Sequence, residues 1–207
     1  NTRSFSLEYR RINRFRPERS CMDTLLMLAV LPAALLLFFV YRLDPVEKEP
    51  PKLLGMLLFL GVISVIPAII LETIFSDLFL AGKDENAFTY LVIENFFGIA
   101  LIEELCKFVF LSLRTWKHPA FTYVFDGIVY AVFVSLGFAI AENIMYVFEY
   151  GFGTGVMRAF TAIPGHCVFA VFMGYLYGEA KFAKVKGYGG ASVLLLILAF
   201  VVPVLSH

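Results

Sequence analysis

The chain has 207 residues, of which 60% are hydrophobic and 16% carry a charge, and its mean hydropathy is +0.81. Soluble domains are roughly 45–50% apolar and about a quarter charged, so this composition excludes an ordinary soluble protein and predicts a polytopic membrane protein. The net charge is zero and no nucleic-acid-binding motif occurs, so no nucleic-acid partner is expected.

The chain begins with a polar segment, residues 1–20, that is rich in arginine. Apolar and aromatic side chains alternate with the arginines, which fits a membrane-surface segment attracted to anionic lipid. A solvated tail, or the end of a further domain, fits equally well. We therefore divide the chain into a basic N-terminal tail, 1–20, and a membrane-embedded domain, 21–207.

Six apolar runs follow, each long enough to cross about 30 Å of hydrocarbon. They cover residues 25–41, 53–71, 88–113, 121–148, 158–177 and 191–204. In the fifth run, Gly174 and Gly178 form a small-residue face suited to close helix packing. The expected fold is an all-α polytopic membrane helix bundle with about six transmembrane helices, in a multi-pass protein of the cell membrane.

The basic residues of the loops indicate an orientation that conflicts with the tail. The loops after the first, third and fifth runs contain eight Lys or Arg residues, whereas those after the second and fourth contain only Lys83, with Arg158 at a boundary. Loops rich in Lys and Arg usually face the cytoplasm, which places the N-terminus outside. The arginine-rich tail favours the opposite arrangement, and we favour the loops.

The second half of the third run contains three charged residues, Glu103, Glu104 and Lys107. Each ionisable group near a bilayer centre costs roughly 2.5–3.5 kcal/mol on insertion scales, so such groups usually face a protein interior or a wet cavity. Residues three and four apart are neighbours on a helix, so Lys107 is within reach of both glutamates. One glutamate can pair with the lysine while the other faces a cavity. The alternative is a charge-neutral packing cluster.

Polar residues of other runs fall at the depth of Glu103. A helix rises 1.5 Å per residue, which places Glu142 about 10 Å, His166 about 12 Å and Glu103 about 14 Å below the face that carries the glycine loop 151–155. His207, after the sixth run, comes out near the same level. Carboxylates and imidazoles from different helices are therefore expected to meet in one layer. Asp126 lies near the other face, where we expect it to cap a helix or anchor a loop.

This layer suits three kinds of chemistry. A glutamate can act as general base on water while a histidine stabilises the oxyanion. The same ligands can hold a zinc ion that activates the water. Carboxylates and histidines can also relay protons in a proton-coupled carrier. Polar residues gathered in one layer favour chemistry at a site over a path across the membrane, and a non-catalytic membrane scaffold is a further alternative.

Several motifs in fixed order carry a resemblance to a known family. They are Tyr-Arg-Leu-Asp-Pro-Val-Glu-Lys-Glu-Pro at 41–50, Glu103-Glu104-x-x-Lys107, Asp-Gly-Ile-Val-Tyr at 126–130, Gly-Phe-Ala-Ile-Ala-Glu-Asn-Ile-Met-Tyr at 137–146, and His166 followed by Met-Gly-Tyr-Leu-Tyr-Gly at 173–178. Over residues 40–207 the sequence resembles the PrsW family of intramembrane proteases, within the superfamily of CAAX prenyl endopeptidases. It departs from the family pattern in the spacing of Lys107 and in Cys167, which stands where alanine commonly follows the motif histidine.

The resemblance implies an intramembrane endopeptidase that works within the lipid bilayer. Its implied substrate is a single-span membrane protein similar to an anti-sigma factor, and the implied cleavage is of the site-1 type. The residues that it implies as catalytic are Glu103, Glu104, Glu142, His166 and Asn143, supported by Lys107 and His207. Among them the water base is Glu103 and an oxyanion donor is Asn143. The implied cofactor is either none or a single divalent metal such as zinc, held by Glu103, Glu142, His166 and His207. We favour the metal-free alternative, because Lys107 already offsets the charge of the glutamates.

Overall fold

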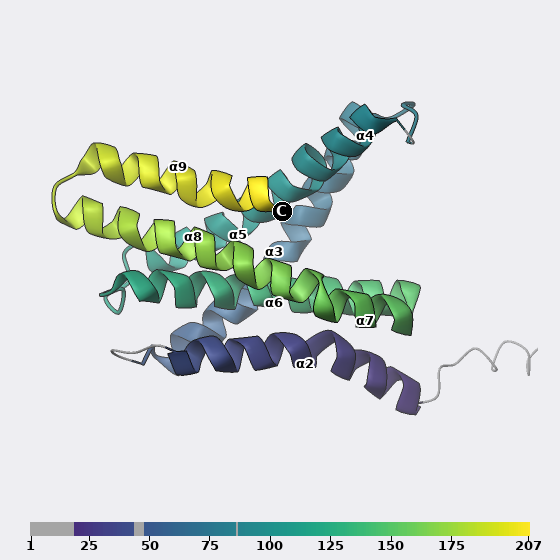
Figure 1. Ribbon diagram of the computed structural model, residues 1–207, viewed down its shortest axis with the longest axis horizontal. Helices are drawn as coiled ribbons and strands as arrows, with labels where there is room; N and C mark the ends of the chain where they lie inside the picture. Colours follow the sequence, from purple (N-terminus) through teal and green to yellow (C-terminus); the bar gives the residue numbers. More distant parts are fainter. Residues whose placement is uncertain (1–18, 44–47, 86) are drawn as a thin grey trace, which may run out of the picture.

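The computed structural model describes residues 19–43, 48–85 and 87–207. Within these ranges the chain is helical and has no strands, which confirms the predicted all-α class. The helices are α2 (Arg19–Leu43), α3 (Pro51–Phe75), the π-helix η1 (Ser76–Leu80), α4 (Phe88–Ile93), the π-helix η2 (Glu94–Ala100), α5 (Leu101–Thr115), α6 (Val124–Tyr150), α7 (Phe152–Phe160), α8 (Ala162–Val185) and α9 (Gly189–Ser206) (Figure 1). The predicted tail, 1–20, falls almost entirely outside the described residues.

Five helical segments are long and apolar enough to cross a membrane. They are Met22–Leu43, Pro51–Leu80, Val124–Tyr150, Phe152–Val185 and Gly189–Ser206. Large apolar side chains on these segments are exposed, among them Leu31, Phe38 and Ile66. Such a surface is unfavourable in water and suits contact with hydrocarbon. The structure therefore confirms a multi-pass membrane protein.

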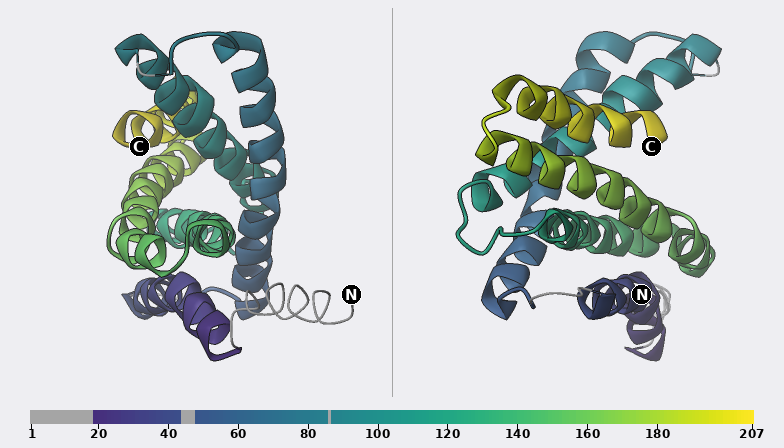
Figure 2. Two further views of the ribbon diagram at one scale, coloured as in Figure 1. Left: turned by 90° about the vertical axis from the view of Figure 1, so that its right-hand side faces the viewer. Right: turned by 60° about the vertical axis from the view of Figure 1, so that its left-hand side comes forward.

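The remaining predicted span differs from these five in composition. The helices α4, η2 and α5 follow one another from Phe88 to Thr115, and they carry Glu94 in addition to the three charged residues identified in the sequence. The segment formed by α4 and η2 extends, with the end of α3 and η1, away from the rest of the bundle (Figures 1 and 2). α5 returns into the bundle, so its charged residues are brought among the other helices.

α6 lies between α3 and α8, and glycines bring the three backbones into contact. A Cβ atom at Gly137 would lie 2.2 Å from the carbonyl oxygen of Leu58 in α3. At Gly127 it would lie 2.5 Å from the carbonyl oxygen of Gly174 in α8. The predicted small-residue face of Gly174 and Gly178 therefore packs against the first turns of α6. Packing this close fixes the height of α3, α6 and α8 relative to one another, and with it the polar residues that they carry.

The start of α6 is capped by an acidic side chain, in agreement with the capping or anchoring role expected for Asp126. Oδ2 of Asp126 accepts hydrogen bonds from the backbone N–H groups of Thr122 at 2.8 Å and Tyr123 at 2.7 Å. These two donors precede the helix and have no partner within it. The cap therefore fixes where α6 begins.

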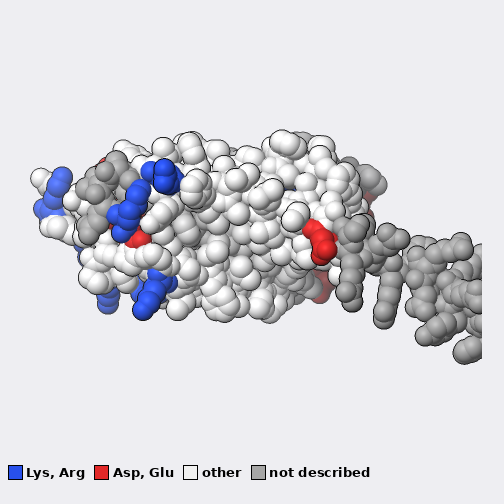
Figure 3. Space-filling view, turned by 90° about the horizontal axis from the view of Figure 1, so that it is seen from below, with Lys and Arg blue, Asp and Glu red and all other residues white. Residues whose placement is uncertain are grey.

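Basic side chains gather at one end of the bundle. In Figure 3, Lys and Arg side chains gather at one end of the visible face, and the opposite end shows acidic side chains. The basic end carries the turns between α2 and α3, between α5 and α6, and between α8 and α9 (Figure 1). The other end carries the turn between α6 and α7.

Candidate functional site

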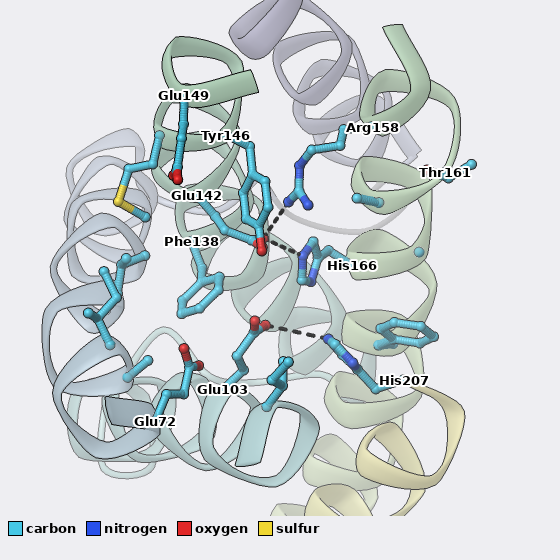
Figure 4. A pocket seen from close by; sticks show the side chains of 18 of the residues that line it. Glu72, Glu103, Phe138, Glu142, Tyr146, Glu149, Arg158, Thr161, His166 and His207 are labelled. Carbon is cyan, nitrogen blue, oxygen red and sulfur yellow. Dashed lines mark hydrogen bonds and ion pairs between the residues drawn. The ribbon is translucent and has the colours of Figure 1, made fainter. Parts of the chain in front are cut away.

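A cavity of about 600 Å³ opens in the half of the bundle that contains the turn between α6 and α7. Residues of α3, η2, α5, α6, α7 and α8 and the last residue of the chain line it (Figure 4). Its polar lining consists of Glu72, Glu103, Glu142, Tyr146, Glu149, Tyr150, Arg158, Thr161, His166 and His207. Four residues predicted from their depth, Glu103, Glu142, His166 and His207, are thus brought together at one cavity.

Lys107 lies behind the wall of this cavity and pairs with both glutamates of α5. Its Nζ atom is 2.9 Å from Oε2 of Glu103 and 2.8 Å from Oε1 of Glu104. Only 4% of the surface of Glu103 is exposed, and 1% each of Glu104 and Lys107. Consecutive helix residues point about 100° apart, and Glu103 lines the cavity while Glu104 does not. Both carboxylates therefore pair with the lysine, and one of them faces the cavity.

His166 connects this cluster to the carboxylate of α6. Its Nδ1 atom is 3.2 Å from Nζ of Lys107, and its Nε2 atom is 3.0 Å from Oε2 of Glu142. An ammonium group can only donate, so we assign Nδ1 as the acceptor and place the ring proton on Nε2, which donates to Glu142. Ser135 donates to the backbone carbonyl of His166 at 3.0 Å. The imidazole is therefore fixed in one orientation between a cation and a carboxylate.

Arg158, from α7, is a site residue whose position in the sequence indicates only the boundary of a span. Its Nη2 atom is 2.7 Å from Oε2 of Glu142, and its Nε–H donates to Oδ1 of Asn143 at 2.6 Å. Its Cζ atom lies 4.1 Å from the centroid of the Tyr146 ring. The available sequence signal is a single arginine at the start of the fifth apolar run, eight residues before His166.

Asn143 takes a different position from the one expected of an oxyanion donor. It is fully buried and does not line the cavity. Its Nδ2 atom donates to the backbone carbonyl of Ala29 in α2 at 3.4 Å, and its Oδ1 atom accepts from Arg158. The structure therefore places Asn143 behind the guanidinium group, where it holds Arg158 instead of facing the cavity.

Two further residues of the lining come from α9 and α3. Nε2 of His207 is 3.4 Å from Oε2 of Glu103, and its ring centroid is 5.7 Å from that of His166. Glu72 of α3 also lines the cavity. The helix does not end with the apolar run at residue 71 but continues through η1 to Leu80, so Glu72 lies within a helix and not in a loop.

Four residues lie close enough together to be considered as metal ligands. They are Glu103, Glu104, His166 and His207, whose donor atoms lie within 4.8 Å of one another. The predicted set had Glu142 in place of Glu104. Carboxylates and imidazoles are suitable zinc ligands. Three of the four residues, however, already surround the ammonium group of Lys107. A divalent ion on the same atoms would lie beside a fixed positive charge, so the arrangement fits a lysine-centred network and does not fit a metal site.

Comparisons with known proteins show the family of the chain. A family model described as "PrsW family intramembrane metalloprotease" matches residues 49–207. The chain is 34% identical to Protease PrsW of Geobacillus kaustophilus (strain HTA426), over 84% of this chain and 75% of the relative. It is 31% identical to Protease PrsW of Bacillus subtilis (strain 168), over 90% of this chain and 80% of the relative. No solved structure matches it. The chain therefore belongs to the PrsW family of intramembrane proteases and is a multi-pass membrane peptidase.

Proposed function

We propose that this protease hydrolyses a peptide bond of a membrane-anchored protein with a water molecule that Glu103 activates. One observation carries the proposal. Of the two buried glutamates beside Lys107, Glu103 is the one that lines the cavity, where water and a peptide can reach it. A general base must lie within hydrogen-bond reach of the water that it deprotonates.

The reaction needs one proton to pass through Glu103. The carboxylate accepts a proton from water as the water oxygen attacks the carbonyl carbon, and the carbonyl oxygen becomes an oxyanion. When the tetrahedral intermediate collapses, the C–N bond breaks and the leaving nitrogen takes a proton. His207, 3.4 Å from Glu103, is placed to pass that proton to the nitrogen. The products are a carboxylic acid and an amine.

Glu104 and Lys107 adjust the charge around this base. The lysine ammonium has three N–H groups, and Glu103, Glu104 and His166 provide one acceptor for each. One cation between two carboxylates leaves the trio with a charge of −1. Lys107 thus makes it possible to bury two carboxylates, while Glu104 shares the lysine and keeps Glu103 able to accept a proton.

Glu142 and His166 form the neighbouring wall of the site. Because His166 contacts Lys107 on one side and Glu142 on the other, it holds the groups of α5 and α6 at a fixed separation. Their role in this proposal is to orient the base and the peptide. A catalytic constellation loses activity steeply when its members shift by about 1 Å.

The substrate class follows from the position and size of the cavity. A transmembrane helix hides its backbone amides in hydrogen bonds, so a single-span substrate has to unwind before water can attack it. A space of about 600 Å³ accepts a short extended segment and not a whole helix. The loop charges favour an extracytoplasmic position for the cavity. These features support the cleavage of an anti-sigma-factor-like protein near that face, in the site-1 manner.

The proposal is tested with the purified protease and a single-span substrate in liposomes. Glu103→Gln keeps the size of the side chain and removes the base, and it is expected to lower kcat by at least about 10³-fold. Glu85→Gln makes the same change at an exposed position between η1 and α4 and is expected to cleave as the unchanged protein does. Cleavage by Glu103→Gln at the control rate would refute the assignment of the base. A non-catalytic scaffold would cleave in neither form.

A further inference from the structure

The proposed reaction creates an oxyanion, and the two donors expected from the sequence are both engaged elsewhere. Asn143 does not line the cavity. The one N–H of the His166 ring donates to Glu142, and its other ring nitrogen accepts from Lys107. Neither residue therefore presents a hydrogen-bond donor to the peptide in this arrangement. Another lining residue has to supply it.

Arg158 is the one permanent cation among the described residues that line the cavity. Lys107 is behind the wall with 1% of its surface exposed, and the tyrosine and threonine hydroxyls of the lining are neutral. The contacts of Arg158 to Asn143 and Glu142 use its Nε–H and one Nη2–H. An arginine fork carries five N–H groups, so three more are available on the guanidinium.

The guanidinium group is held rigidly before any substrate binds. The fully buried Asn143 fixes its Nε side, Glu142 fixes one Nη2–H, and the Tyr146 ring lies 4.1 Å from Cζ. In Figure 4, Arg158 and Glu103 extend from opposite parts of the cavity lining, with Glu142 and His166 between them. Donors that are preorganised toward developing charge need no rearrangement during the reaction, and removing one such donor lowers kcat by about 10²–10³-fold.

We propose that Arg158 is a catalytic residue of this protease. Its free N–H groups donate to the carbonyl oxygen of the scissile peptide and stabilise the oxyanion that forms when water attacks from the side of Glu103. The proposal rests on the hydrolysis by Glu103 described above. Asn143 and Glu142 act on the peptide through Arg158, since they fix the plane of the guanidinium group.

The competing explanation is that Arg158 only holds Glu142 in place. The two explanations differ in how tightly variants bind a mimic of the intermediate. A peptidyl trifluoromethyl ketone of the substrate sequence hydrates to a tetrahedral diol, whereas the matching uncleaved peptide represents the ground state. Dissociation constants of both ligands can be measured in liposomes with variants that no longer cleave.

Arg158→Gln is expected to weaken binding of the ketone by about 10²–10³-fold and that of the peptide by less than about 3-fold, with kcat reduced as much as ketone affinity. Arg158→Lys keeps the charge and is expected to recover part of the loss. Glu142→Gln leaves the arginine held by Asn143 and should weaken ketone binding far less. Arg114→Gln, an exposed arginine at the other end of α5, is the matched control.

Equal losses of ketone affinity in Arg158→Gln and Glu142→Gln would overturn the proposal, as would an Arg158→Gln variant that loses both ligands alike. If Arg158→Gln fails to fold, the Arg158→Lys and Glu142→Gln pair decides the question by the same comparison. Glu103→Gln separates this proposal from the one on which it rests. If Arg158→Gln keeps the wild-type kcat while Glu103→Gln is inactive, the proposed role of the arginine is refuted and the assignment of the general base stands.

Discussion

Replacing Lys107 with methionine perturbs the polar centre of the bundle most strongly. Methionine has a similar length and fills the same volume, so the change removes a charge and three N–H donors with little change in packing. Glu103, Glu104 and His166 lose their common partner at 2.9, 2.8 and 3.2 Å. Two buried carboxylates then lie next to each other without a cation.

The structure sets the size of the expected effect. Removing one partner of a buried ion pair costs about 3–5 kcal/mol, because the other charge remains buried and unpaired. One carboxylate can take up a proton, which limits the loss, so we expect Lys107→Met to lower the free energy of unfolding by about 3–5 kcal/mol. Adding Glu104→Gln removes the second carboxylate and should restore about 2 kcal/mol of this loss.

The single tryptophan of the chain offers a direct assay. Trp116 packs against Tyr177, with ring centroids 5.3 Å apart, so its fluorescence reports the loss of this packing during unfolding in mixed detergent micelles. Lys117→Met, at an exposed position, is the control and should stay within about 0.5 kcal/mol of the unchanged protein. A loss below 1 kcal/mol in Lys107→Met, or a double variant less stable than the single one, would refute the lysine-centred network.

Three further predictions concern the packing, the basic end and the metal question. Gly137→Ala places a Cβ atom 2.2 Å from the carbonyl oxygen of Leu58 and should destabilise the protein in the same detergent assay by about 1–3 kcal/mol or more. Gly55 has open space around it, so Gly55→Ala should leave the stability unchanged. Equal effects of the two substitutions would contradict the close contact of α3 and α6. Tyr130→Phe removes the 2.5 Å hydrogen bond to buried Glu49 and should cost about 1.5–3 kcal/mol of stability, and an unchanged unfolding midpoint would speak against that contact. Elemental analysis of the purified protein should find less than one bound zinc per chain, and a chelator should leave the cleavage rate unchanged; stoichiometric metal with loss of activity on chelation would instead support a metal-dependent reaction.

The depth of the site could be predicted because it depends on one regular quantity. The rise of a helix per residue is constant, so counting from the ends of the apolar runs brings Glu103, Glu142 and His166 to one level. In the structure Lys107 contacts Glu103 at 2.9 Å and His166 at 3.2 Å, and His166 contacts Glu142 at 3.0 Å. The pattern of small residues likewise predicts the contact between α6 and α8. Both predictions need only helix geometry, and both hold without knowledge of how the helices are arranged.

The direction of each side chain could not be predicted in the same way. Asn143 and Glu142 are consecutive, so they point about 100° apart, and only the arrangement of α2 and α7 decides that Asn143 is turned toward Arg158. Arg158 stands at the start of the fifth apolar run, and the apolar pattern does not indicate that a separate short helix, α7, carries it. Glu72 could not be assigned to the site from the apolar pattern, because η1 extends the second span beyond its apolar run.

The comparison of Glu103→Gln with Glu104→Gln tests the central claim most directly. The two residues are neighbours, carry the same charge and contact the same lysine, but only Glu103 lines the cavity. With a reconstituted substrate, Glu103→Gln is expected to lower kcat by at least about 10³-fold and Glu104→Gln by about 10-fold. An inactive Glu104→Gln variant beside a Glu103→Gln variant that still cleaves would contradict the assignment of Glu103 as the base that activates water.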